Sequence, residues 1–130
     1  MGSDSLSKRG LAVFEKEWGT IRMAEKAIIK SIKDFLNELV RQGVPVEYGV
    51  LFGSYVGGRK VDQWSDIDLL VISPRYDRKY GRKDINLLWR IAARTDSRIE
   101  PIPVGIKRWQ TDNASTILEI ARREGVRVSI

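Results

Sequence analysis

The first long apolar pattern in the chain repeats with the period of an α-helix. Thr20 belongs to a residue type that caps helix N-termini, and Gly43 to one that ends helices. Between them, apolar residues recur about every 3.6 positions, and most charges fall off that stripe. We therefore predict a long amphipathic helix whose buried stripe consists of Ile21, Ala24, Ile28, Ile32, Phe35, Leu36 and Leu39.

Four later segments have the patterns of β-strands. Val46–Phe52 has one apolar face in a period of two, and Asp66–Ser73 is almost wholly apolar after its start. The second pattern is typical of a central strand that is buried on both faces. Ser97–Val104 contains two prolines, which predict an edge position, and Val126–Ile130 is a short terminal strand.

Helices and loops are predicted between these strands. Amphipathic spacing predicts helices at Ile85–Arg94 and Ala114–Ala121, and a weaker pattern predicts a short helix at Ser54–Lys60. Arg75–Asp84, which is basic and contains two tyrosines, and Lys107–Asn113 are predicted to be loops.

The order of these elements predicts the fold class. Helices and strands alternate, which favours an α/β (α+β) fold with one mixed sheet of four to five strands and helices packed mainly on one face. We expect Val46–Phe52 and Asp66–Ser73 to be adjacent in this sheet. We expect one domain at residues 20–130. An N-terminal segment or short helix at residues 1–19 precedes it, with Leu11, Phe14 and Trp18 at helical spacing.

Composition narrows the possible chemistry. The 130 residues carry a formal net charge of +6 and include no Cys and no His. Disulfides, zinc–cysteine sites and histidine bases are therefore excluded. Without a long apolar run or a signal-peptide core, a cytoplasmic location is expected. The positive charge favours an anionic partner, such as a nucleotide, a nucleic acid or an acidic protein. Alternatively, the excess Lys and Arg residues merely solvate helix faces.

Two carboxylates open the second predicted strand. Residues i and i+2 of a strand point to the same face, so Asp66 and Asp68 project side by side while Ile67 points away. Two adjacent carboxylates repel each other unless a positive charge lies between them. Hard cations such as Mg²⁺ are commonly held by one or two carboxylates together with substrate phosphates. The pair is therefore a candidate Mg²⁺ or Mn²⁺ site.

A second candidate feature follows the first predicted strand. Gly53 permits close approach of the backbone to a ligand, and Ser54 offers a hydroxyl and an N–H group at a possible helix N-terminus. Such a position suits a phosphate group. A simple turn with a helix cap would use the same two residues.

The two features together resemble the nucleotidyltransferase superfamily that includes DNA polymerase β. That family carries an apolar residue, Gly, then Gly or Ser, a gap of about ten residues, and Asp, an apolar residue and Asp or Glu. The matching positions are Phe52, Gly53, Ser54, Asp66, Ile67 and Asp68. The resemblance extends over about residues 46–130 and is greatest to the minimal nucleotidyltransferases of prokaryotes.

The resemblance implies roles for individual residues. Asp66 and Asp68 would hold metal, and Glu100, on the next strand, would be the third acid that binds a metal and helps deprotonate the nucleophile. Gly53 and Ser54 would cradle the triphosphate. Ser65 would orient the neighbouring carboxylate.

The resemblance also implies a reaction and a partner. A nucleoside triphosphate, ATP or another, would bind with Mg²⁺ or Mn²⁺ and pass its monophosphate to an acceptor hydroxyl. Related minimal nucleotidyltransferases are often antitoxins that adenylylate a HEPN-type toxin. The short chain lacks an obvious acceptor-binding domain, so the acceptor site is expected on a protein partner or across a homo-oligomer interface.

Two other function classes stay open. The chain could be a catalytically weak protein that binds a nucleotide or a partner, or a nucleic-acid binder that uses the basic segment 75–84. In that segment, Tyr76 and Tyr80 lie among five cations, a mixture that suits nucleic acid or a mobile solvated loop. Trp64, in the motif loop, either packs on the sheet edge or stacks on a base or partner.

Overall fold

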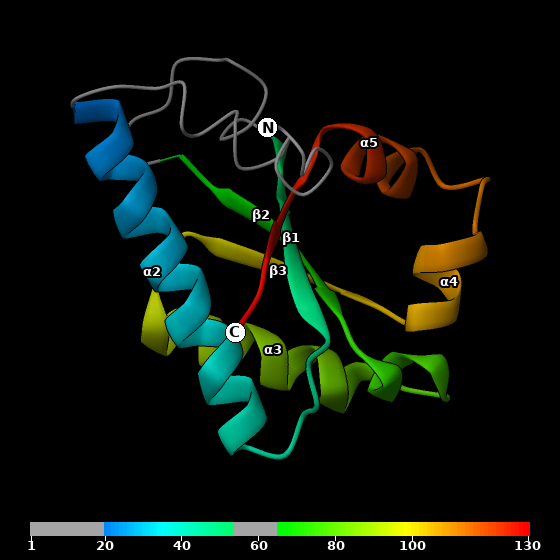
Figure 1. The fold of residues 1–130 in the computed structure, drawn as a ribbon. Coiled ribbons are helices and arrows are strands. Elements are labelled where there is room, and N and C mark those ends of the chain that lie inside the picture. Colours follow the sequence, from blue (N-terminus) through cyan, green and yellow to red (C-terminus); the bar gives the residue numbers. More distant parts are fainter. Residues whose placement is uncertain (1–19, 54–64) are drawn as a thin grey trace.

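The computed structural model describes the backbone of residues 20–53 and 65–130 and the side chains of residues 26–53 and 65–130 (Figure 1). The described chain contains both helices and strands. Their bounds are α2 (Thr20–Arg41), β1 (Tyr48–Phe52), β2 (Ile67–Ile72), the 3₁₀-helix η2 (Pro74–Asp77), α3 (Arg82–Thr95), β3 (Ile99–Val104), α4 (Ile106–Thr111), α5 (Thr116–Glu124) and β4 (Val126–Val128).

The described strands form one mixed sheet in the order β3-β2-β1-β4. β1 pairs antiparallel with β2 and with β4, whereas β2 and β3 are parallel. The predicted adjacency of the first two strands is confirmed, with Phe52 opposite Asp68 and Tyr48 opposite Ile72. This pairing brings the end of β1 beside the start of β2, where the candidate residues lie.

Alternation along β2 divides the core into two layers. Ile67, Leu69 and Val71 belong to the layer beneath α2 and α3, and Leu70 and Ile72 to the layer on the opposite face. All five side chains are buried, as expected for a central strand without a solvent-facing side. The start of β2 is therefore held from both faces.

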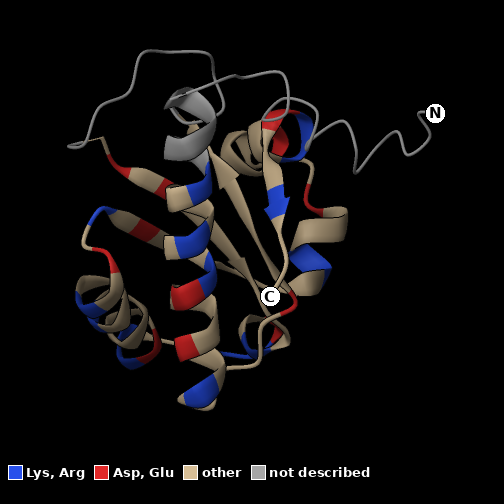
Figure 2. Cartoon of the chain, turned by 60° about the vertical axis from the view of Figure 1, so that its left-hand side comes forward, with Lys and Arg blue, Asp and Glu red and all other residues tan. Residues whose placement is uncertain are grey.

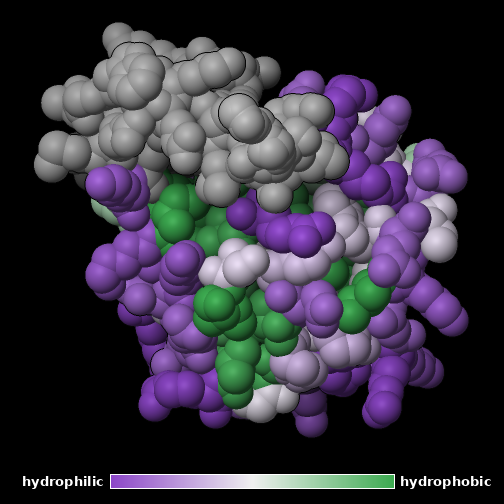
Figure 3. All heavy atoms as spheres, in the orientation of Figure 1, coloured by the Kyte–Doolittle hydropathy of each residue, from purple (hydrophilic) through white to green (hydrophobic). Residues whose placement is uncertain are grey.

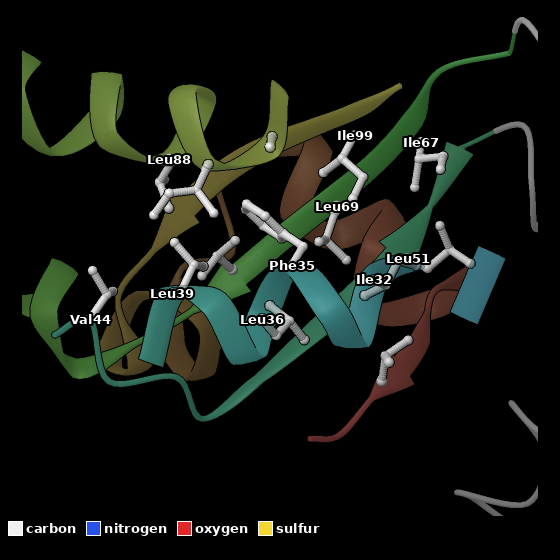
Figure 4. Packing of buried hydrophobic residues seen from close by; sticks show 14 of the residues in the cluster. Ile32, Phe35, Leu36, Leu39, Val44, Leu51, Ile67, Leu69, Leu88 and Ile99 are labelled. Carbon is white, nitrogen blue, oxygen red and sulfur yellow. The ribbon is translucent and has the colours of Figure 1, made fainter. Parts of the chain in front are cut away.

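α2 contributes more buried residues to the larger layer than any other element. Ile32, Phe35, Leu36 and Leu39 are fully buried and point from the helix onto the sheet (Figure 4). They follow the predicted stripe because residues three and four apart lie on one helix face. Burying each large apolar side chain contributes about 1.5–3 kcal/mol to folding.

Helices cover both faces of the sheet to different extents. The two longest, α2 and α3, lie together on one face, and the shorter α4 and α5 lie on the other (Figure 1). The mixed four-stranded sheet and the α+β class are as predicted. The short helices leave the second face less covered, and the candidate carboxylates are on that face.

The edge position of β3 is also confirmed. Its Pro101 and Pro103 lie in the outermost strand of the described sheet, where a missing N–H costs no ladder hydrogen bond. Glu100 stands between Ile99 and Pro101 and is directly opposite Asp68 in the register.

The prediction of a loop at Lys107–Asn113 is wrong, because α4 occupies most of it. Asp77 caps this helix by accepting a hydrogen bond from the Lys107 N–H (3.0 Å). At its other end, the Arg122 guanidinium donates to the carbonyls of Trp109 (2.8 Å) and Asp112. Contacts from residues 30 and 13 positions away thus stabilise a helix that its own short sequence does not predict.

The prediction of a loop throughout Arg75–Asp84 is also wrong. η2 opens the segment, with the Ser73 hydroxyl accepting from the Arg75 N–H (3.0 Å), and α3 begins at Arg82. Tyr76 is buried against Tyr80, and burial raises the pKa of its hydroxyl to about 12. The tyrosines therefore pack inward instead of interleaving with the cations at the surface.

Hydrophobic side chains also reach the surface. Val40 and Ile130 are about half exposed. In Figure 3, green patches lie among purple side chains on the lower half of this face, where α2 runs beside the end of the chain. Among the helices of the described ranges, none is long and apolar enough to cross a membrane.

Three predictions lie outside the described residues. These are the N-terminal segment 1–19, with Phe14 and Trp18, the short helix at Ser54–Lys60, and the position of Trp64.

Candidate active site

Three strand ends meet at the candidate site. Asp68 is the second residue of β2, and its neighbours across the sheet are Phe52 of β1 and Glu100 of β3. Asp68 and Glu100 share a face with the buried Leu70, because side chains alternate along each strand. In Figure 2, red positions lie at the starts of β2 and β3, next to the grey trace. The register thus brings together the two acids that the sequence separates by 32 positions.

Gly53 lies against the Asp68 carboxylate. A Cβ at this position would overlap Oδ2 of Asp68. The backbone φ of Gly53 is +85°, in the left-handed region that side chains rarely adopt. Two independent constraints therefore require glycine at this position: the backbone conformation and the space taken by the Asp68 carboxylate.

The surroundings of the acids favour their protonated forms. Burial is the main factor that raises the pKa of Asp68, and the negative charge of Asp66 adds to it. Burial likewise raises the pKa of Glu100, followed by a side-chain hydrogen bond with Asp66 and repulsion from Asp66 and Asp68. The three acids are thus close enough to affect one another. A bound cation would relieve both repulsion and burial cost.

Asp96 lies four residues before Glu100 and has a cation of its own. Arg98 donates to both oxygens of Asp96, from Nε at 3.0 Å and from a terminal nitrogen at 2.7 Å. These hydrogen bonds lower the pKa of Asp96, whose side chain is only 12% exposed. The Arg98 carbonyl also accepts the Ile67 N–H at 2.8 Å, which ties this turn to the start of β2. Arg98 was not singled out from the sequence, although its spacing of two from Asp96 permits such a pair.

Two other acids, Asp84 and Asp77, have structural contacts. Asp84 caps α3 by accepting the Gly81 N–H and also binds Arg75, and Asp77 caps α4. Asp62 and the proposed phosphate ligand Ser54 lie outside the described residues. Ser65, which directly precedes the exposed Asp66, is half-buried.

The donor set suits a hard divalent cation. Asp66, Asp68 and Glu100 supply only carboxylate oxygens, which are the ligands that Mg²⁺ and Mn²⁺ prefer. In the described ranges, no group of three or more acidic side chains is already arranged to hold a metal ion. The fit therefore rests on the chemistry of the three acids and their mutual repulsion.

Comparison with known families agrees with this geometry. Residues 29–120, well over half of the chain, match the nucleotidyltransferase domain family. The chain belongs to this family. No curated protein gave a match to the chain.

The matched range contains the whole candidate site of this nucleotidyltransferase domain. Residues 29–120 include Gly53, Asp66, Asp68 and Glu100, and they begin inside α2 and end inside α5. Family membership supports nucleotidyl transfer as the general activity. Domains of this kind generally use a nucleoside triphosphate and a divalent metal.

Proposed function

We propose that the chain is a metal-dependent nucleotidyltransferase that moves a nucleoside monophosphate, AMP from ATP in the simplest case, onto a hydroxyl of a macromolecular acceptor. The observation that carries the proposal is the register pairing of Asp68 with Glu100, with Gly53 against the Asp68 carboxylate. The family match supports the class of reaction.

The proposed reaction exchanges one P–O bond for another. The acceptor oxygen forms a bond to the α-phosphorus, the bond from that phosphorus to the bridging oxygen breaks, and pyrophosphate leaves. A divalent cation, when bound, neutralises the charge that develops on the phosphate oxygens.

The residues of the chain have separate tasks in this proposal. Asp66 and Asp68 hold the cation, and Ser65 orients the Asp66 side chain. Gly53 and Ser54 bring backbone N–H groups to the triphosphate. Glu100, opposite Asp68 in the register, also binds the metal and helps to deprotonate the acceptor hydroxyl.

The acceptor is proposed to be a protein, as in the minimal nucleotidyltransferases that adenylylate a HEPN-type toxin. Two hollows occur in the described ranges, and neither is lined by Asp66, Asp68 or Glu100. One is lined by Asp34, Glu38 and Arg94 among others, and the other by Pro45, Pro74, Arg75 and Arg78. A macromolecule would bring its own binding surface to the open site.

A second function is nucleotide or partner binding with little catalysis. It is favoured by the absence, within the described residues, of an acid cluster already arranged to hold metal.

Radiolabelled ATP distinguishes the two functions. The chain is purified with its native partners and incubated with Mg²⁺ and ATP labelled at either the α- or the γ-phosphate.

Transfer of the α-label, but not the γ-label, to a partner polypeptide supports nucleotidyl transfer. The Asp66→Asn/Asp68→Asn variant should lose this labelling while it still copurifies with the partner. Copurification without labelling in either protein would support the binding function instead.

A further inference from the structure

The outward face of α3 is strongly basic. Arg82, Lys83, Arg90 and Arg94 are all exposed, and at 100° per residue they fall within one arc of the helix surface. The single acid of this helix, Asp84, lies outside that arc. Its oxygens accept from Arg75 (2.8 Å) and from the Gly81 N–H (3.0 Å). The exposed face therefore carries positive charge without a compensating carboxylate of its own helix.

α2 shows what a solvated charged face looks like in the same molecule. Two of its cations pair with acids about one turn away, Lys30 with Asp34 (2.7 Å) and Arg41 with Glu38 (2.9 Å). Both colours therefore appear along this helix in Figure 2. By contrast, Arg82, Lys83 and Arg90 form neither a hydrogen bond nor an ion pair with any part of the chain that the structure describes.

An exposed aromatic side chain lies beside these cations. Trp89 is 45% exposed and Ile85, one turn earlier, is 36% exposed. Together with Ala93 they form a ridge spaced by four residues, and Arg82, Asn86 and Arg90 form the adjacent ridge. Trp89 is thus nearly half exposed, next to cations that have no partner among the described residues.

We propose that this face, defined by Arg82, Lys83, Asn86, Trp89 and Arg90, binds single-stranded RNA. Arginine and lysine side chains contact the phosphates, and Trp89 offers a ring on which an unpaired base stacks. The Asn86 amide can both donate and accept a hydrogen bond, which suits a ribose 2′-hydroxyl.

The same features disfavour other anionic partners. Bases of a duplex are stacked on one another and cannot stack on Trp89, and the deep, narrow major groove of duplex RNA does not admit side chains. An acidic protein would be attracted by the charge but has no bases to stack on the ring. Tyr76 and Tyr80 pack on each other with Tyr76 buried, so Trp89 replaces them as the aromatic contact.

The proposed RNA face is separate from the nucleotidyl-transfer site. α3 belongs to the layer that contains Ile67 and Leu69, whereas Asp68 and Glu100 lie on the opposite face of the sheet. The two proposals can therefore fail independently. The Asp66→Asn/Asp68→Asn variant should bind RNA as the parent does.

Fluorescence anisotropy with a fluorescein-labelled 15-nucleotide RNA of mixed A and U tests the proposal. With about three to four phosphate contacts, log K should fall with log salt at a slope of roughly −2 to −3, or about 20- to 50-fold between 50 and 200 mM salt. Poly-L-glutamate, anionic vesicles, duplex RNA and DNA of the same sequence serve as competitors. Each should compete more weakly than unlabelled RNA.

Variants with matched charge locate the binding face. Arg82→Glu/Arg90→Glu should weaken RNA binding at least tenfold, because two phosphate contacts become repulsions. Lys26→Glu/Lys33→Glu on α2 has the same change in net charge and should weaken it much less. Trp89→Ala should cost about tenfold and Trp89→Phe much less, since phenylalanine still stacks. Thermal melts confirm that each variant is folded.

Several results would overturn the proposal. Equal losses from the α2 and α3 charge variants would leave only non-specific attraction to a basic protein. If poly-L-glutamate or vesicles compete as well as RNA, the face binds anions in general. If duplex RNA competes equally well, base stacking on Trp89 does not contribute to binding. DNA that binds as tightly as RNA would contradict the contact with the 2′-hydroxyl.

Discussion

Asp96 and Glu100 lie at the two ends of the short segment that leads into β3, and their carboxylates have opposite surroundings. The Arg98 guanidinium donates two hydrogen bonds to Asp96, which lower the pKa of Asp96. Burial and the neighbouring Asp66 and Asp68 raise the pKa of Glu100. In the described part of the chain, neither Glu100 nor Asp68 has an ion-pair partner.

The difference separates a structural acid from a functional one. Asp96 lowers the free energy of the folded state through a cation that the chain itself supplies. Asp68 and Glu100 raise it, because their charges are partly buried beside other acids. Unfavourable burial of like charges is expected where a protein binds a ligand of opposite charge.

The largest expected effect is the loss of activity when an acid of the candidate site, but not Asp96, is removed. Asp68→Asn or Glu100→Gln should lower labelled transfer by about 10³-fold or more, since metal coordination contributes several kcal/mol and each 1.36 kcal/mol is tenfold. Asp96→Asn should keep activity within a few fold at a temperature where it remains folded. Comparable losses in Asp96→Asn and Asp68→Asn would erase the distinction.

Gly53→Ala should destabilise the domain by about 1–3 kcal/mol through the strained backbone, with a further loss from overlap with Asp68. Gly43→Ala is the matched control, since its φ is +94° but its Cβ would meet nothing within 4 Å. Urea unfolding of both variants isolates the contribution of the carboxylate. If the two losses are equal, Asp68 does not restrict Gly53.

Asp96→Asn should lower the free energy of unfolding by about 1 kcal/mol at neutral pH, because a partly buried two-point ion pair with Arg98 is lost. The folded pKa of Asp96 is lowered, so its contribution exists above the ordinary pKa and is lost as pH falls through the folded pKa. The exposed pair Lys30–Asp34 provides the control. Asp34→Asn should change stability by only a few tenths of a kcal/mol, and an Asp96→Asn loss no larger than this would show that Arg98 does not stabilise Asp96.

The smallest expected effect has the opposite sign. Without divalent metal, Asp68→Asn should slightly raise the melting temperature at neutral pH. The folded pKa of Asp68 is raised, so the parent loses stability as pH rises from the ordinary carboxylate pKa through the folded pKa. The advantage of the variant should disappear below the ordinary pKa. If the variant is less stable than the parent at neutral pH in EDTA, the charge of Asp68 does not destabilise the folded state.

The sequence predicted those parts of the fold and site that depend on local pattern. The apolar stripe of α2, the two prolines of the edge strand and the Asp66–Ile67–Asp68 alternation each follow from side-chain periodicity. The adjacency of β1 and β2 was also predicted, and it brings Phe52 opposite Asp68.

Features that depend on contacts distant in sequence were not predicted. α4 exists because Asp77 and Arg122 hold its ends, and no pattern within its six residues indicates this. Tyr76 lies in a basic segment, yet tertiary packing buries it. The Arg98–Asp96 pair is local, two residues apart, but it depends on a turn whose geometry single-sequence patterns do not specify.

Binding of a divalent cation is the most direct test of the central claim that Asp66, Asp68 and Glu100 form a metal site. The melting temperature is measured in EDTA and with increasing MnCl₂, for the parent and for Asp66→Asn/Asp68→Asn. The parent should gain stability by mass action, about 2.7 kcal/mol at a Mn²⁺ concentration 100 times Kd, and the variant should gain none. A variant that responds to Mn²⁺ as the parent does would show that these carboxylates are not the ligands.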